Sequence, residues 1–288
     1  MRAPTPLPGK SHRATRPSNL KAVLPNFLIA KLQWFTPLSD ADRLALHGAT
    51  AKRRQVGARE DIAHEGQAHG PVRMILDGWA CRYRQLDDGR RQITAILLPG
   101  DLCDTHVNVL CEMDHSIGTI TPVTLAEIAR DRLDALVGSR PIVGRALWWE
   151  MLAAVSVQRE WTVNIARREG IARLGHLFCE LFHRLRAVGL TRDFGYGLPL
   201  RQSELADALG LTEVHVNRCL RALRDRDLIT LRGRWLTILD LPALERASLF
   251  RPNYLHLGRR NAANAVGPVP ARPPETYRYG SSHYQSAR

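Results

Sequence analysis

Residues 212–221 carry side chains that can read the edges of DNA bases. In the major groove, arginine forms paired hydrogen bonds with guanine, and asparagine forms them with adenine. A valine can make only an apolar contact there, for example with the methyl group of thymine. The candidate DNA-contacting set in this segment is therefore Thr212, Glu213, Val214, His215, Asn217, Arg218 and Arg221.

Residues 202–221 also have the features of two helices joined by a tight turn. Ala206 is small enough for two helices to approach, and Gly210 can adopt the positive φ that the turn needs. Thr212 can cap the second helix. The apolar residues that would hold both helices on a core are Leu205, Leu209, Leu211, Val216 and Cys219. The pattern predicts a helix-turn-helix; the alternative is a plain helical hairpin with a solvated basic face.

Two short β-prone runs follow at residues 228–238, on either side of a glycine flanked by arginines. They predict a β-hairpin wing with a basic tip. Arg232 and Arg234 at this tip, with Arg224 and Arg226 before it, are expected to contact phosphates. Such contacts position a protein on DNA without selecting a sequence.

The charge of the whole chain fits a polyanionic partner. The 288 residues carry a net charge of +13, with a pI near 10.3, and such an excess attracts nucleic acid or an anionic surface. No apolar run is long enough to span a bilayer, and no apolar signal core precedes residue 18. The expected partner is double-stranded DNA, with no membrane, and the expected location is the cytoplasm.

Catalytic and metal-binding patterns do not emerge. The sequence has no Gly-rich phosphate loop, no His-Glu-x-x-His and no Gly-x-Ser-x-Gly. Asp40 and Asp42 form a close carboxylate pair of the kind that starts a helix. The five cysteines are scattered, without a Cys-x-x-Cys pair, which predicts reduced and mostly buried thiols. The expected protein is not an enzyme, with no catalytic residues and no metal ligands.

The elements that must position the DNA-contacting residues divide the chain into five parts. We expect a disordered basic tail at residues 1–20, a β-roll sensor at 21–138 and a dimerisation helix at 139–169. A winged helix-turn-helix domain at 170–257 and a disordered tail at 258–288 complete the chain. The predicted class is α+β, with a jelly-roll-like antiparallel β-roll before the long helix.

Within the sensor, residues 32–129 show a β-rich pattern. Glycines recur about every ten residues, a spacing typical of an antiparallel sandwich or barrel. The predicted strands are residues 72–76, 79–83, 92–97 and 123–128, with a hairpin turn at residues 87–89.

A long helix is predicted from Pro141 to about Arg168. Apolar residues recur along it at spacings near three and four, at Leu147, Met151, Ala154, Trp161 and Ile165. Such a helix can form a seam with a second helix, or it can be buried within its own chain. A second helix with a broad apolar face is predicted at residues 171–188.

Taken together, residues 32–257 resemble the Crp/Fnr family of transcription regulators. The resemblance rests on the β-roll motifs at residues 75–84, 88–93 and 98–101, and on the recognition motif at 210–218. It implies a homodimer that binds a palindromic DNA site, with RNA polymerase as a further partner if the protein is an activator. Arg218 matches the family arginine that contacts a guanine, whereas Val214 replaces a common family glutamate.

The resemblance also places the effector pocket. Asp104-Thr105 and His115-Ser116 stand where cyclic-nucleotide-binding members carry Gly-Glu and Arg-Ser pairs. A histidine is a poor substitute for an arginine on phosphate, so we expect no tight cyclic nucleotide binding. No cysteine precedes Cys81, which argues against the family's N-terminal iron–sulfur cluster. No cofactor is predicted, and a haem or redox role is left open.

A second function remains to be weighed. The β-roll is a binding module in its own right, so the chain could chiefly sense a small ligand or a protein, with only weak DNA contact. Charge reversal at Arg218 separates the two hypotheses.

Overall fold

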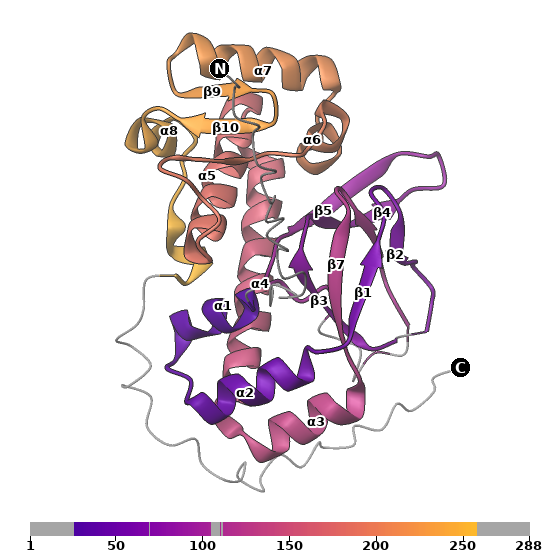
Figure 1. The fold of residues 1–288 in the computed structure, drawn as a ribbon. Helices are drawn as coiled ribbons and strands as arrows, with labels where there is room; N and C mark the ends of the chain where they lie inside the picture. Colours follow the sequence, from indigo (N-terminus) through magenta and orange to yellow (C-terminus); the bar gives the residue numbers. More distant parts are fainter. Residues whose placement is uncertain (1–25, 69, 105–109, 111, 258–288) are drawn as a thin grey trace, which may run out of the picture.

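The computed structural model describes residues 26–68, 70–104, 110 and 112–257 (Figure 1). Three parts follow one another along the chain: a helix-flanked β-roll, a long helix, and a helical domain with a small β-sheet. The predicted α+β class and its order of parts are confirmed. No helix in the described part of the chain is long and apolar enough to cross a membrane.

The β-roll consists of two antiparallel sheets. The first has the order β1-β7-β3 and the second β2-β6-β4-β5. Between them lies a core that includes Ile75, Ile117 and Leu125, each fully buried. The strands are β1 (Arg53–Val56), β2 (Asp61–Ala63), β3 (Val72–Asp77), β4 (Ala80–Gln85), β5 (Arg91–Leu97), β6 (Ser116–Thr119) and β7 (Val123–Ile128).

The predicted strands at 72–76, 92–97 and 123–128 are confirmed by β3, β5 and β7. The strand predicted at 79–83 begins one residue later, because Gly78 turns the chain with φ +86°. A Cβ on Gly78 would lie 2.2 Å from the carbonyl oxygen of Pro122, so this tight turn requires glycine.

The prediction that the β-rich part begins near residue 32 is wrong. Two helices precede the first strand: α1 (Phe27–Phe35) and α2 (Asp40–Ala49). A capping box starts α2, in which Ser39 and Asp42 each bond the other's backbone N–H. Leu28, Leu32 and Leu46 bury these helices against the first sheet. A further helix, α3 (Arg130–Ser139), follows the last strand of the roll.

The long helix α4 (Pro141–Arg167) confirms the predicted element and spans 27 residues. A short joint connects it to α5 (Gly170–Ala187). At this joint a Cβ on Gly170 would lie 2.5 Å from His215 Nε2 and 3.0 Å from Cys219 Sγ. A side chain at position 170 would therefore require the His215 ring to move away from the joint.

The apolar residues of α4 face in two directions. Trp161 is buried within its own chain, and Leu147, Met151, Ala154 and Ile165 are half-buried. A separate stripe is exposed, at Trp148 (63%), Leu152 (56%), Val155 (40%) and Val163 (46%). The residues predicted to pair with a second helix therefore lie on a different side of α4 from the exposed stripe. Spacings of three and four describe both faces equally well, which is why the sequence pattern did not separate them.

The C-terminal domain contains α6 (Gln202–Leu209), α7 (Glu213–Asp225) and α8 (Leu241–Ala247), and a 3₁₀ helix at Pro252–Leu255. Its sheet has the order β8-β10-β9, formed by β8 (Gly195–Gly197), β9 (Ile229–Arg232) and β10 (Trp235–Ile238). Its core continues without a break onto Ile93, Ile96 and Leu98 of the β-roll.

Candidate nucleic-acid interface

The helices α6 and α7 form a helix-turn-helix. Gly210 ends α6 in the left-handed conformation, with φ 61°. The side-chain oxygen of Thr212 caps α7 by accepting the backbone N–H of His215 at 3.2 Å. Val216, Cys219, Leu220 and Leu223 bury one face of α7. The roles predicted for the glycine, the cap and the apolar residues are confirmed.

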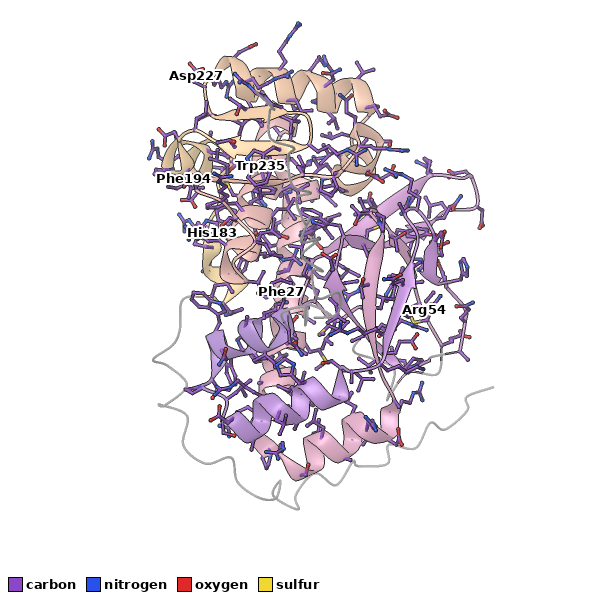
Figure 2. The ribbon with its side chains drawn as sticks, in the orientation of Figure 1. Phe27, Arg54, His183, Phe194, Asp227 and Trp235 are labelled. Atoms are coloured by element: carbon purple, nitrogen blue, oxygen red, sulfur yellow. The ribbon has the colours of Figure 1, made fainter. Side chains whose placement is uncertain are left out.

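The opposite face of α7 is exposed. Val214 is 72% exposed, and Glu213, Asn217, Arg218 and Arg221 are also exposed. Figure 2 shows side chains of this helix, which ends close to the labelled Asp227, pointing outward at the edge of the molecule. The face thus offers polar, apolar and cationic groups to a groove without rearrangement of the fold.

His215 departs from this arrangement. Its side chain is half-buried, and Nε2 lies against Gly170 at the joint between α4 and α5. Residues 215 and 219 lie one turn apart on one side of the helix, and Cys219 is buried. His215 therefore lies beside the joint and is less exposed than its neighbours on α7, and its predicted contact with DNA stays a prediction.

The wing is a β-hairpin, as predicted. β9 pairs antiparallel with β10, and Gly233 at its tip has φ 61°. Arg232 and Arg234 flank that glycine and are both exposed. Exposed arginines thus lie both at this tip and on α7, and arginine is a residue type that contacts phosphates beside a groove.

The residues predicted for the effector pocket have other contacts. Asp104 is 1% exposed and accepts from the backbone N–H of Arg73 at 3.0 Å and from its guanidinium at 2.9 Å. Burial raises the pKa of Asp104 even beside this arginine. His115 Nδ1 contacts Asp114 at 2.5 Å, and the Ser116 hydroxyl accepts the backbone N–H of Glu65 at 3.0 Å. Thr105 lies outside the described residues.

These contacts lead to an expected result with cyclic nucleotides. We expect micromolar cyclic AMP or cyclic GMP to leave the melting temperature within about 1 °C of that of the free protein, because a ligand present below its dissociation constant adds almost no stability. Differential scanning fluorimetry measures this shift. A concentration-dependent rise of several degrees with either nucleotide would contradict the expectation.

The described cysteines are buried, and burial raises the pKa values of their thiols. Cys81, Cys103, Cys179 and Cys219 are buried. Burial raises the pKa of the Cys81 thiol to about 11 and that of the Cys179 thiol to about 12. At neutral pH both therefore stay in the protonated, poorly nucleophilic form.

The fold and its exposed α7 surface define a class of protein: a regulator that joins a sensor-type β-roll to a winged helix-turn-helix. Models of known protein families match both the β-roll and the winged helix-turn-helix. Residues 53–140 match the model of the cyclic nucleotide-binding domain, and residues 172–247 match the Crp-like helix-turn-helix domain.

Known relatives give the same result. The transcriptional activator protein FnrL of Cereibacter sphaeroides is 26% identical over 198 residues, which cover 68% of this chain and 79% of that protein. The nitrogen fixation regulation protein FixK of Azorhizobium caulinodans is 24% identical over 242 residues, covering 84% and 94%. The structure of FixK2 from Bradyrhizobium japonicum has the same fold, with a TM-score of 0.62 at 23% identity, and the match covers 68% and 96% of the two chains.

The chain belongs to the Crp/Fnr family of DNA-binding transcription regulators.

Proposed function

We propose that this protein acts as a homodimer that reads a palindromic DNA site through Arg218 and its neighbours on α7. The observation that carries the proposal is the exposed face of α7, which presents Arg218, Asn217 and Val214 together on a helix-turn-helix. Arg218 would bond a guanine edge and Asn217 an adenine edge, while Val214 would contact a thymine methyl group. Arg232 and Arg234 on the wing would hold the phosphate backbone.

The exposed stripe on α4 supports the dimer. Four large apolar side chains remain in solvent along one side of this helix, at Trp148, Leu152, Val155 and Val163. A pair of such helices would bury this surface. Pairing through α4 would also bring two winged domains together, as recognition of two half-sites requires.

The cellular setting follows from the partner. We propose that the protein acts in the cytoplasm, where its DNA is accessible. The relatives include proteins named as transcriptional activators, and a protein that activates in this way would also contact RNA polymerase.

Selection of bound sites from random DNA tests the base reading. At about 150 mM salt, we expect the wild-type protein to recover a palindrome with a guanine opposite Arg218 and a thymine opposite Val214. The Val214→Glu variant should exchange that thymine for a cytosine, because a carboxylate accepts from the cytosine amino group.

The salt concentration matters because a chain of net charge +13 binds DNA non-specifically at low salt. Recovery of non-palindromic sequences alone, or an identical site for both proteins, would contradict the proposed reading.

A further inference from the structure

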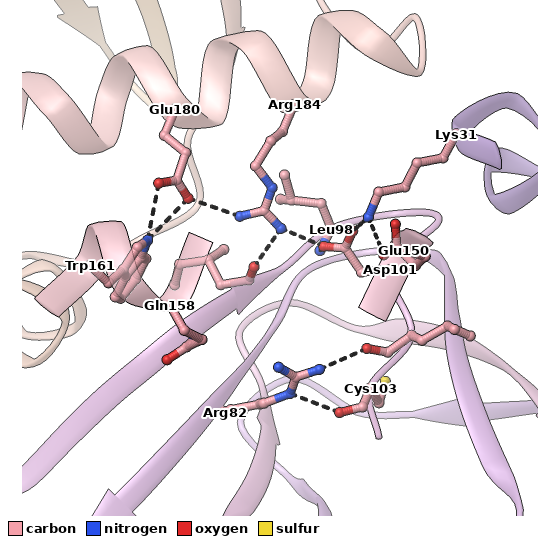
Figure 3. Close-up of polar contacts among 12 residues, drawn as sticks. Lys31, Arg82, Leu98, Asp101, Cys103, Glu150, Gln158, Trp161, Glu180 and Arg184 are labelled. Atoms are coloured by element: carbon pink, nitrogen blue, oxygen red, sulfur yellow. Dashed lines mark hydrogen bonds and ion pairs between the residues drawn. The ribbon is translucent and has the colours of Figure 1, made fainter. Parts of the chain in front are cut away.

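A continuous set of largely buried ion pairs joins the sensor to the DNA-binding domain (Figure 3). At its centre lies Arg184, on α5. One nitrogen of its guanidinium donates to Asp101 at 2.6 Å and to the carbonyl oxygen of Ile96 at 2.9 Å. The other donates to Glu180 at 3.1 Å. Arg184 thus connects two residues of the sensor with the helix that begins the DNA-binding domain.

On the sensor side, Asp101 has several further partners. The carboxylate of Asp101 accepts the backbone N–H of Leu98 at 2.7 Å and so closes the turn that follows β5. Lys31 of α1 donates to the same carboxylate at 2.6 Å and to Glu150 of α4 at 2.5 Å. Burial alone would raise the pKa of Asp101, but the charges of Lys31 and Arg184 lower it to about 2. Asp101 therefore stays ionised between two cations at neutral pH.

On the DNA-binding side, Glu180 is fully buried. Its carboxylate accepts the indole N–H of Trp161 on α4 at 3.1 Å and the hydroxyl of Tyr254 at 2.9 Å. Arg184 therefore bonds to a carboxylate that is itself held between α4, α5 and the segment after α8.

A second contact lies between the sensor and the helix-turn-helix itself. Gln92 of β5 donates to the carbonyl oxygen of Ala208 on α6 at 3.4 Å. Arg59 lies 3.6 Å from Glu204 at the start of the same helix. The sensor therefore contacts α5 through Arg184 and α6 through Ala208 and Glu204. The face of α7 that carries Arg218 remains exposed.

We infer that the Asp101–Arg184 ion pair is a positioning contact which, beside the shared apolar core, holds the DNA-binding domain against the sensor in the orientation that binds DNA. The inference rests on the proposed function, because it assigns a consequence for DNA affinity. A buried ion pair adds little net stability, since removing two charges from water offsets their attraction. Its geometric specificity, with one guanidinium shared between two parts of the molecule, suits a role in orientation.

The test uses the full chain with Arg184→Gln. In this variant Asp101 keeps Lys31, and Glu180 keeps Trp161 and Tyr254. We expect hydrogen exchange to accelerate about tenfold at the backbone amides of β5 and α6, while those of β7 and α7 keep wild-type rates. We also expect about tenfold weaker binding to the selected DNA site at the same salt, within the usual range of coupling between sites.

Arg73→Gln is the matched control, because it breaks an Arg–Asp pair of similar burial that lies wholly within the sensor. This control should leave both readouts at wild-type values. Arg184→Lys keeps the charge but has a single ammonium group in place of the planar guanidinium, so we expect an intermediate effect. This variant replaces Arg184→Gln if Arg184→Gln does not fold.

Unchanged exchange at β5 and α6, unchanged or tighter DNA binding, or an equal loss in Arg73→Gln would each overturn the inference. A wild-type protein that selects no DNA site would instead overturn the proposed function. The exchange measurement, which needs no DNA, would still decide whether the ion pair holds the two parts together.

Discussion

Replacing Arg218 by glutamate is expected to remove sequence-specific DNA binding while the fold is retained. Arg218 is exposed on α7 and has no part in the core, so its loss costs little stability. A paired arginine–guanine contact is worth about 1–3 kcal/mol, and a dimer would make two of them. A carboxylate at this position also repels phosphate, so we expect affinity to fall at least a hundredfold.

Fluorescence anisotropy with a labelled selected site, at a fixed salt concentration, measures this loss. Arg132→Glu is the control: it makes the same change in net charge at an exposed arginine on α3, far along the chain from α7. Affinity should fall much less in the control. Equal losses in the two variants would show that binding depends on overall charge, and would favour a sensing module with weak DNA contact.

Leu152→Glu is expected to convert the dimer into a monomer. Leu152 lies in the middle of the exposed stripe on α4 and is 56% exposed in the single chain. In a dimer that pairs this stripe, two carboxylates would be buried near each other without partners, at a cost of several kcal/mol. A monomer reads one half-site, so we expect DNA affinity to fall about a hundredfold or more as well.

Sedimentation equilibrium gives the mass of the particle directly. The control is Leu44→Glu, which places the same charge on an exposed leucine of α2, itself 74% exposed and outside the stripe. The control should remain dimeric with wild-type DNA affinity. A dimeric Leu152→Glu protein would show that the subunits associate through another surface.

Elements that depend on local signals were predictable from the sequence. The wing was recognised because β-prone runs flank an Arg-Gly-Arg tip, and the helix-turn-helix because Gly210 and Thr212 mark its turn and cap. The direction of the His215 side chain was not predictable from local signals. It depends on Gly170, which lies 45 residues earlier in the chain and leaves room for the ring beside the joint.

Contacts between distant residues were also missed. The turn at residues 98–101 was visible as a family motif, yet Asp101 bonds an arginine 83 residues further along the chain. Neither residue type nor spacing indicates such a pair, because helix and strand periods describe only neighbours within one element. Helix α1 has a different reason: residues 27–35 are almost wholly apolar and lack the polar face that marks an amphipathic helix. The start of α2 did carry a local signal, because Asp40 and Asp42 lie in its first turn.

The shared core between β5 and the DNA-binding domain has a practical consequence. Ile93, Ile96 and Leu98 belong to the same apolar cluster as Phe178 and Leu181 of α5. β5 is also the last strand of its sheet, so it has one edge without a neighbouring strand. A fragment cut after α4 would expose this apolar surface and an unpaired strand edge together, which is the combination that leads to aggregation. The two domains should therefore be expressed and crystallised as one piece.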